Sequence, residues 1–435
     1  MSFQNAGALI ARFRELGATR IFCKSLAEND NSKQQIYLGS GFEVLSFFPH
    51  GEITAYPDLK EPNFKATVQL YWTDSDAFER ASGSQLILYP AYPEVRLSGF
   101  LAGCKLAPAA HLMQIPKEKR RGYDGRVLVF GTTGDGRILA HLAPAGTAMA
   151  NELLARFASS SPAGLFLELT LAIGSAQNKS LVLAKLRCIH VAGFHESCRL
   201  DKSGKLMQYK ALNGGGYTLE ALLGIVPNGY SEPDYLGWEI KAHSTNRVTL
   251  MTPEPNGGIY RDQGAKAFVE RYGHAVDNGA KYFTGTHKVG VPCVATGMTM
   301  QVKGFDAQAS KIVDVAGAVT LIDANGNLAA SWAFAHLLTH WNKKHAFAAY
   351  VQYSSRKDPL AYKYNSPVMM GEHTDFPRYL KALCGGLVVF DPGSKVTLAG
   401  TAKSKVKARS QFRVNVGNLD QLYQRLTVED ISAKE

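Results

Sequence analysis

PDYLGWEIK, residues 233–241, is the stretch that decides the fold of the C-terminal half of the chain. If residues 236–241 form a strand, Glu239 and Lys241 lie two positions apart and project from the same face of that strand. Asp234 lies in the turn that enters the strand, from which its carboxylate can swing towards the same point. The pattern predicts that two acids and one amine meet at one end of a strand.

These residue types suit a metal-assisted hydrolysis. The carboxylates of Asp234 and Glu239 and the carbonyl oxygen of Ile240 are hard ligands of the kind that Mg²⁺ prefers. Lys241 would orient or deprotonate a water for attack on a phosphodiester, and the metal would lower the pKa of that water. Glu220, in the expected helix TLEALLGI (218–225), offers a third carboxylate. An ordinary strand with surface acids and a lysine remains an alternative on this spacing alone.

The composition is that of a globular protein with a polyanionic partner. The chain has 435 residues, of which 46% are hydrophobic and 20% charged, so we expect more than one domain and no wholesale disorder. Lys and Arg outnumber Asp and Glu by 48 to 37, a net charge of +11 that favours a polyanionic partner, with nucleic acid first. No run approaches the roughly 18 apolar residues of a membrane span. Six cysteines without a CxxC pair fit the reducing cytoplasm, where we expect the protein.

The two halves of the chain differ in texture, and we expect domains at 1–200 and 201–435. In the first half, short apolar runs alternate with turn residues, which predicts a β-rich domain. In the second half, expected helices at 265–272 and 329–344 mix with strands at 345–353 and 385–392. This mixture predicts an α/β or α+β domain.

A basic segment near the C-terminus, KSKVKARSQFR (403–413), is the candidate DNA-reading element. Its basic residues alternate, so a strand would place them on one face. Arg pairs with guanine and Gln with adenine in the major groove. An edge strand that carries Lys only to block aggregation is the alternative. The predicted DNA contacts are Lys405, Lys407, Arg409, Gln411 and Arg413, with Asp391 and His373 as further candidates for the same surface.

The segment GGGYTLEALLGIVPNGYSEPDYLGWEIKAH (214–243) resembles the MvaI/BcnI group of type II restriction endonucleases, which are PD-(D/E)xK nucleases. The resemblance continues through WAFAHLLTHWNKKHAFAAYV (332–351) and KARSQFRVN (407–415), and covers about residues 205–430. It implies that Asp234, Glu239 and Lys241 form the hydrolytic centre with Glu220 assisting. It also implies a Mg²⁺-dependent monomer that works beside a cognate DNA methyltransferase.

A second resemblance lies in the N-terminal half. KSLAENDNSKQQIYLGSGFEVLSFFP (24–49), followed by EVRLSGF (94–100), is similar to EcoRII-type effector domains, which are B3-like DNA-binding pseudo-barrels. That fold grips DNA with two arms, and Arg96 stands nearly alone here where those domains carry a denser basic cluster. A β-barrel whose polar loop is only a turn remains the alternative. The resemblance implies DNA contacts by Lys24, Asn29, Asp30, Gln35 and Tyr37 on one arm, and by Glu94 and Arg96 on the other.

Together the two resemblances imply a multidomain, type IIE-like restriction endonuclease. A B3-like pseudo-barrel at 1–200 would bind a second copy of DNA as an allosteric effector, and an α/β PD-(D/E)xK domain at 201–435 would cut. The implied target is a short C/G-flanked site, with CCWGG preferred. Two other functions remain open: a phage-defence nuclease of the same fold with weaker sequence demand, and a non-catalytic B3-type DNA-binding protein.

Overall fold

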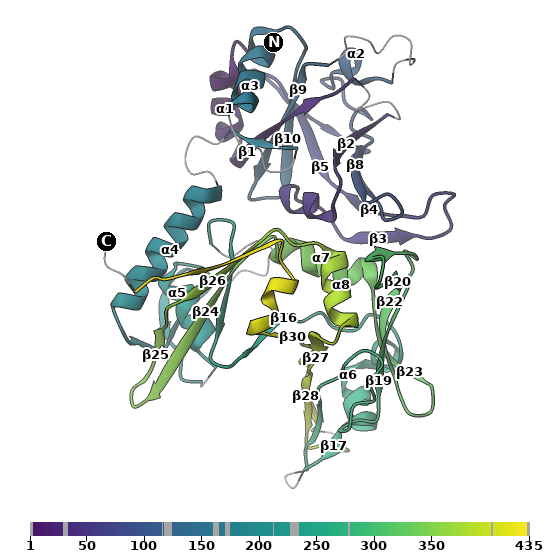
Figure 1. The fold of residues 1–435 in the computed structure, drawn as a ribbon, viewed down its shortest axis with the longest axis vertical. Coiled ribbons are helices and arrows are strands. Elements are labelled where there is room, and N and C mark those ends of the chain that lie inside the picture. Colours follow the sequence, from purple (N-terminus) through teal and green to yellow (C-terminus); the bar gives the residue numbers. More distant parts are fainter. Residues whose placement is uncertain are drawn as a thin grey trace. The chain divides into compact units, whose positions relative to one another are not determined.

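The computed structural model of the chain divides into two compact units, residues 1–176 and 177–435, which are described separately (Figure 1). It describes residues 3–28, 34–114, 116, 124–159, 165–169, 175–211, 213–226, 235–276, 279–401 and 403–432, apart from the side chains of 175–177 and 343–344.

The division between the units falls earlier than the predicted domain boundary at residues 200 and 201. Helix α4 (Ser175–Val191) explains the difference, because its apolar residues Val182 and Leu186 join the core of the second unit. Lys179 on the same helix forms ion pairs of 2.9 and 2.8 Å with two glutamates of that unit. Residues 195–208, which span the predicted boundary, contain short strands of the second unit: β12 (His195–Glu196), β13 (Cys198–Leu200) and β14 (Leu206–Gln208).

The first unit consists of two sheets, as its alternating sequence predicts. One sheet has the order β11 (Leu167–Glu168), β1 (Ala18–Leu26), β9 (Arg126–Thr133), β10 (Arg137–Ala143), β5 (Gln69–Thr73) and β6 (Phe78–Ala81). The other has the order β2 (Gln35–Gly39), β8 (Glu94–Ser98), β7 (Gln85–Tyr89), β4 (Asn63–Thr67) and β3 (Ile53–Tyr56). The pairings among the described residues leave both sheets open and close no barrel.

Helices cover the first of these sheets. Helix α1 (Ala6–Glu15) begins at Asn5, whose side chain accepts the backbone N–H of Ala8 at 2.9 Å. Its apolar residues Leu9 and Phe13 pack with α3 (Ala148–Ala158) and with strands β1 and β9 in one core. The β-rich prediction is thus confirmed. The shorter helices of this unit are α2 (Ala109–Leu112) and the 3₁₀ helix η1 (Phe42–Phe47).

The second unit is built around a sheet that we call the hydrolytic sheet, after the role that the sequence predicts for Glu239 and Lys241 on its strand β15. Its order is β12, β25 (Leu360–Tyr364), β24 (Phe347–Lys357), β26 (Val368–Glu372) and β31 (Arg425–Glu429), and β15 (Glu239–His243) pairs in parallel with β24. Helices α4 and α5 (Gly215–Leu222) lie along this sheet (Figure 1). The mixture of helices and strands confirms the α/β prediction.

A second sheet of this unit holds β16 (Arg247–Met251), β30 (Phe412–Asn415) and β27 (Val388–Phe390) in that order, and we call it the recognition sheet because it carries the predicted DNA contact Arg413. Its core is aromatic, because Trp332, Phe390 and Phe412 pack with ring centroids 4.7 to 5.3 Å apart. The helices nearby are α7 (Phe334–Lys344) and α8 (Phe376–Cys384). The predicted helix at 329–344 is wrong in its first turn, since 328–333 is a strand, β23 (Leu328–Ala333), that pairs with β22 (Ala318–Ile322).

The remaining elements form smaller layers. They are α6 (Ile259–Tyr272), the sheet of β17 (His274–Ala275), β18 (Lys281–Thr284), β28 (Gly393–Thr397) and β29 (Lys405–Lys407), the strand β19 (Thr299–Lys303) beside β22, the pair β20 (Phe305–Asp306) and β21 (Lys311–Ile312), and the 3₁₀ helix η3 (Val416–Gln421). None of the helices in the described ranges is long and apolar enough to cross a membrane.

Candidate active site

Strand β15 carries the centre of the candidate site, and its alternation decides which side chains meet there. Trp238, Ile240 and Ala242 face the core shared with α4 and α5. The residues between them, Glu239 and Lys241, therefore project from the opposite face. In the ladder with β24, Lys241 is the Cα partner of Tyr350. The predicted strand at 236–241 is confirmed for its last three residues.

A tight turn sets the start of this strand. Tyr235 and Trp238 exchange two backbone hydrogen bonds, of 3.0 and 2.9 Å. The two residues between them, Leu236 and Gly237, both have positive φ, at 50° and 82°, as two-residue hairpin turns of the primed type require. Trp238 then packs on Phe347 with ring centroids 5.3 Å apart. The turn explains why the strand begins three residues later than the sequence indicates.

Glu239 and Lys241 form a short ion pair, with 2.6 Å between Nζ and Oε1. The Glu239 side chain is only 3% exposed, and that of Lys241 is 20% exposed. A carboxylate this deeply buried is costly without a cation beside it, so each member requires the other. The pair can hold a cation and present an ammonium to a phosphate at one place.

The carboxylate and carbonyl oxygens of this strand fit a hard divalent cation. Glu239 supplies a buried carboxylate, and Ile240 supplies the backbone carbonyl that the sequence proposes as a ligand. Asp234, the other predicted ligand, lies outside the described residues. Within the described ranges, no three His, Cys, Asp or Glu side chains gather as a complete metal site.

Glu220 lies on α5, and its side chain is half-buried. The helix packs against the strand pair that carries the site, since Leu219 shares a core with Ile240 and Ala349. The structure thus brings the helix of Glu220 to the core side of β15, and the expected approach of its carboxylate to Glu239 and Lys241 stays a prediction.

His243 completes the face of β15 that carries Glu239 and Lys241, and sequence reasoning missed it. The side chain is buried, and its Nδ1 lies 2.9 Å from the carbonyl of Thr245. Because a carbonyl only accepts, Nδ1 carries a proton and Nε2 is the free acceptor of the neutral ring. Burial lowers the pKa of His243, so the ring is neutral at physiological pH. The E-x-K-x-H alternation was the available signal.

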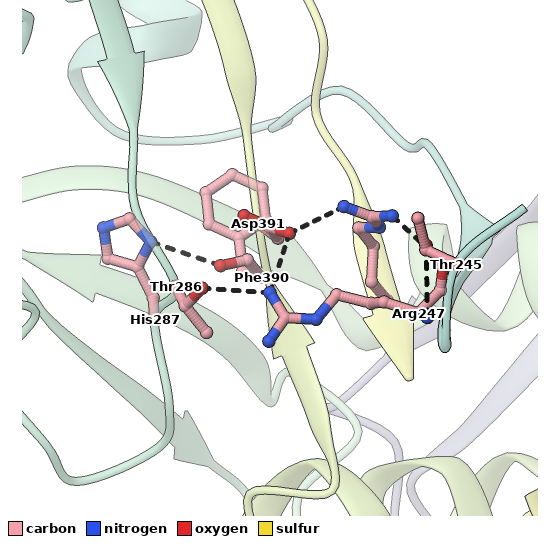
Figure 2. A network of polar contacts seen from close by, with 7 residues as sticks. Thr245, Arg247, Thr286, His287, Phe390 and Asp391 are labelled. Carbon is pink, nitrogen blue, oxygen red and sulfur yellow. Dashed lines mark hydrogen bonds and ion pairs between the residues drawn. The ribbon is translucent and has the colours of Figure 1, made fainter. Parts of the chain in front are cut away.

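A second cluster of charge surrounds Asp391, directly after β27 (Figure 2). Its Oδ2 accepts from Arg247 Nη1 at 3.1 Å and from Arg413 Nη1 at 2.9 Å. Arg247 also donates to Thr286 at 3.2 Å, and Arg413 Nη2 donates to the carbonyl of Arg247 at 3.1 Å. Two guanidiniums around one carboxylate leave one net positive charge. The structure therefore joins Asp391 and Arg413, two of the predicted DNA contacts, and adds Arg247, which the sequence did not single out.

The rest of the basic segment does not form the single strand that we expected. Lys405 and Lys407 lie on β29, which pairs with β28, whereas Arg413 lies on β30 in the recognition sheet. The prediction of one strand is wrong because the chain changes sheets between them, where the backbone N–H of Arg409 donates to Ser394 at 2.9 Å. Lys405, Lys407 and Arg409 are exposed, and the carbonyl of Gln411 accepts the N–H of Asp391 at 2.8 Å.

His373 lies apart from the Asp391 cluster in the fold. It follows β26 of the hydrolytic sheet, where its ring packs on Phe347 at 5.1 Å between centroids. Its backbone has a positive φ of 56°, and its N–H donates to the carbonyl of Ala346 at 2.9 Å. This candidate therefore belongs to the end of the hydrolytic sheet.

In the first unit, four of the predicted DNA contacts meet on neighbouring strands. Arg96 on β8 is the Cα partner of Tyr37 on β2, and its guanidinium lies 5.8 Å from the centre of the Tyr37 ring. Arg96 also binds both carboxylate oxygens of Glu94, at 2.8 and 3.0 Å. Gln35 donates to the hydroxyl of Tyr89 at 3.3 Å.

The other predicted contacts of this unit are not part of that cluster. Lys24 lies on β1 in the other sheet, where it is buried and donates to the carbonyl of Ser25 at 3.2 Å. Asn29 and Asp30 lie outside the described residues.

Comparison with known proteins addresses the second unit. Residues 183–423 match the model of the MvaI/BcnI restriction endonuclease family. The solved structure "Restriction endonuclease MvaI-cognate DNA substrate complex" is similar at 20% identity with a TM-score of 0.45, over 57% of this chain and 97% of that chain. "Restriction endonuclease MvaI in the absence of DNA" is similar at 18% identity with a TM-score of 0.32, over 58% of this chain and 97% of that one. Both TM-scores lie below 0.5, so the assignment rests on the family model. A search of the curated proteins found no match.

Proposed function

The chain belongs to the MvaI/BcnI restriction endonuclease family, whose model spans more than half of it, and we propose that it is a Mg²⁺-dependent, type IIE-like enzyme that cuts at CCWGG. Membership makes it a site-specific deoxyribonuclease that binds double-stranded DNA, in a family that uses divalent metal ions. The proposal concerns which residues act, on which site, and with what help from the first unit.

The observation that carries the hydrolytic assignment is the Glu239–Lys241 ion pair on β15. Asp234, Glu239 and the Ile240 carbonyl would hold Mg²⁺, which when bound lowers the pKa of a water and stabilises negative charge on the phosphate. Lys241, whose Nζ lies 2.6 Å from the Glu239 carboxylate, would orient the water for in-line attack as an ammonium, or accept its proton as a neutral amine. The 3′ oxygen then leaves, and Glu220 assists from α5. The burial of Glu239 keeps this geometry rigid.

Base reading falls to the cluster around Asp391. A carboxylate accepts from the N4 amino group of cytosine, and a guanidinium donates to O6 and N7 of guanine, so acid and base together match a C·G pair. Asp391 and Arg413, joined at 2.9 Å, are half-exposed and can exchange this bond for contacts to base edges. Exposed Lys405, Lys407 and Arg409 would contact phosphates, with Gln411 and His373 as further contacts.

The first unit would bind a second copy of DNA as an effector, as a B3-like domain does. The cluster of Tyr37, Glu94 and Arg96 supports this proposal, because it combines an aromatic face with a guanidinium on adjacent strands. The remaining contacts of this surface would come from Gln35, Asn29 and Asp30, whereas Lys24 is buried in the other sheet and is left out of it. We further propose that the enzyme acts as a monomer in the cytoplasm, where a cognate methyltransferase protects host sites.

The test is cleavage of a multi-site plasmid with Mg²⁺ and with EDTA, followed by sequencing of the fragment ends. Discrete ends at CCWGG that require Mg²⁺ are the expected result. A smear would favour a phage-defence nuclease with weak sequence demand. Intact plasmid, even with a short CCWGG duplex added as effector, would contradict the proposal and favour a DNA-binding role.

A further inference from the structure

A chain of three buried side chains runs from the hydrolytic sheet to the recognition sheet. Tyr350 on β24 lies beside Lys241 in the ladder and projects from the same face. Its hydroxyl lies 2.8 Å from the hydroxyl of Tyr423, which in turn lies 3.5 Å from Nδ1 of His345. None of the three is more than 2% exposed. Buried polar groups nearly always have a hydrogen-bond partner, and these three side chains supply partners to one another.

The far end of this chain is a β-bulge in the recognition sheet. The register of β16 against β30 shifts between Thr249 and Met251, so Leu250 has no Cα partner in that ladder. The carbonyl of Leu250 is 3.0 Å from Nε2 of His345. Leu250 lies three residues from Arg247, which holds Asp391. His345 thus contacts the strand that carries part of the base-reading cluster.

The direction of the protons along the chain follows from the acceptor at its end. Because the Leu250 carbonyl only accepts, Nε2 of His345 carries a proton, and in the neutral imidazole Nδ1 then accepts from the hydroxyl of Tyr423. The oxygen of Tyr423 then accepts from the hydroxyl of Tyr350. Burial, and to a smaller extent the charge of Glu239, raises the pKa of both hydroxyls, so they stay protonated and the order is fixed.

The surrounding packing holds the three rings in place. The Tyr423 ring lies over Gly371, where a Cβ would come within 2.6 Å of the ring. The His345 ring stacks on Trp341 with centroids 4.3 Å apart and an interplanar angle of 16°. Replacing Gly371 by any other residue would displace the Tyr423 ring. The close approach of β26 to that ring is therefore part of the arrangement.

We propose that Tyr350, Tyr423 and His345 are positioning residues that hold the Glu239–Lys241 face in a fixed position against recognition strand β16. They touch no substrate atom. Their hydrogen bonds connect β24, the neighbour of β15, to β16. A DNA site bound at the recognition sheet then has its scissile phosphate against Lys241. This inference rests on the proposed function, because it assigns the hydrolytic role to that face.

Tyr423→Phe tests the proposal, since it removes one hydroxyl and keeps the ring over Gly371. The single-turnover rate on a CCWGG duplex with Mg²⁺ should fall about 10- to 100-fold, the usual effect of a small misplacement of catalytic groups. The Kd for the same duplex in EDTA, measured by fluorescence anisotropy, should stay unchanged. Tyr350→Phe should behave alike, and the double variant should be no slower than Tyr423→Phe, because both break one chain.

Two comparisons separate positioning from a general loss of stability. His345→Gln keeps a donor and an acceptor and should retain more of the rate than His345→Phe. Tyr260→Phe is the control. The buried Tyr260 hydroxyl donates to Glu254, which takes no part in the hydrogen bonds of Tyr350, Tyr423 and His345, so its loss should leave the rate unchanged.

Several results would overturn the proposal. They are a Tyr423→Phe rate equal to that of the wild type, additive losses in the double variant, and rate and affinity that fall together. If the wild type leaves the duplex intact, the proposed function fails. If the wild type cuts and the variants match it, only the positioning role fails.

Discussion

The Glu239–Lys241 pair and the Arg247–Asp391–Arg413 cluster are both ion pairs around a carboxylate, but the fold assembles them differently. The first joins two residues that are two positions apart on one strand. The second joins Asp391 to residues 144 and 22 positions away, on two other strands. The first is therefore fixed by local alternation, whereas the second exists only when three strands pair.

The two also differ in exposure, which suits different tasks. The carboxylate of Glu239 is 3% exposed, and the three side chains of the Asp391 cluster are between 18% and 36% exposed. A buried pair keeps one geometry, which suits the hydrolytic role proposed for it. A half-exposed cluster can trade its internal bonds for bonds to bases, and the internal bonds order the side chains beforehand.

Lys241→Ala breaks the buried side of this comparison and has the largest expected effect. It removes the ammonium beside Glu239, so the cleavage rate should fall by about 1,000-fold, while DNA binding persists. Asp234→Ala should do the same. Plasmid cleavage and duplex affinity measured side by side check this, with Lys363→Ala on β25 of the same sheet as control. Cleavage at the wild-type rate would remove Lys241 from the centre.

Asp391→Asn breaks the exposed side. The amide keeps the shape of the carboxylate but loses its charge, so both arginines lose their ionic partner and cytosine N4 loses an acceptor. Discrimination between CCWGG and singly substituted duplexes should fall by about 1–3 kcal/mol in kcat/KM. Asp420→Asn, an exposed aspartate beside Gln421, is the control. Unchanged discrimination would take Asp391 out of base reading.

Arg96→Ala sharpens the comparison in the first unit, because Glu94 and Arg96 have the same i, i+2 spacing as Glu239 and Lys241 but are 24% and 15% exposed. We expect a reading role here rather than a hydrolytic one. The binding free energy of a separate effector duplex should weaken by about 1–3 kcal/mol at fixed salt. The cleavage reaction at the Lys241 site should itself stay intact.

Arg137→Ala is the matched control for this prediction. Arg137 has the same spacing from its partner Asp135, at 2.8 Å, on a hairpin of the other sheet. Equal effects of the two variants would show that Arg96 has no special part in DNA binding.

The smallest expected effect concerns pH and the support of the reading cluster. Burial lowers the pKa of His287 below the ordinary 6.5, and its Nδ1 lies 3.3 Å from the carbonyl of Phe390, next to Asp391. The unfolded chain then binds more protons than the native one as pH falls below 6.5, so the free energy of unfolding decreases towards acid. Urea unfolding at several pH values gives the free energy of unfolding as a function of pH. The slope of that free energy against pH should be shallower for His287→Gln than for the wild type, and unchanged for the exposed His274→Gln. Identical slopes for the wild type and His287→Gln would contradict this assignment.

Features that depend only on neighbouring residues could be predicted from the sequence by itself. The alternation of Trp238, Ile240 and Ala242 with Glu239 and Lys241 predicted the strand and its two faces, because side chains of a strand alternate whatever the strand pairs with. The α/β character of the second unit and the β-rich first unit followed from the same periodicities. The family of the second unit was recognised from the motif around this strand.

Only the tertiary structure decided which distant residues meet. Residues 403–413 alternate like one strand, yet β29 and β30 belong to different sheets, because each finds its hydrogen-bond partners in a different strand. No sequence motif surrounds Arg247. Its part in the Asp391 cluster follows from the pairing of β16 with β30. The buried chain from Tyr350 to Leu250 likewise needs the bulge in β16. Local spacing determines the face on which a side chain lies, and strand pairing over long separations determines what stands opposite it.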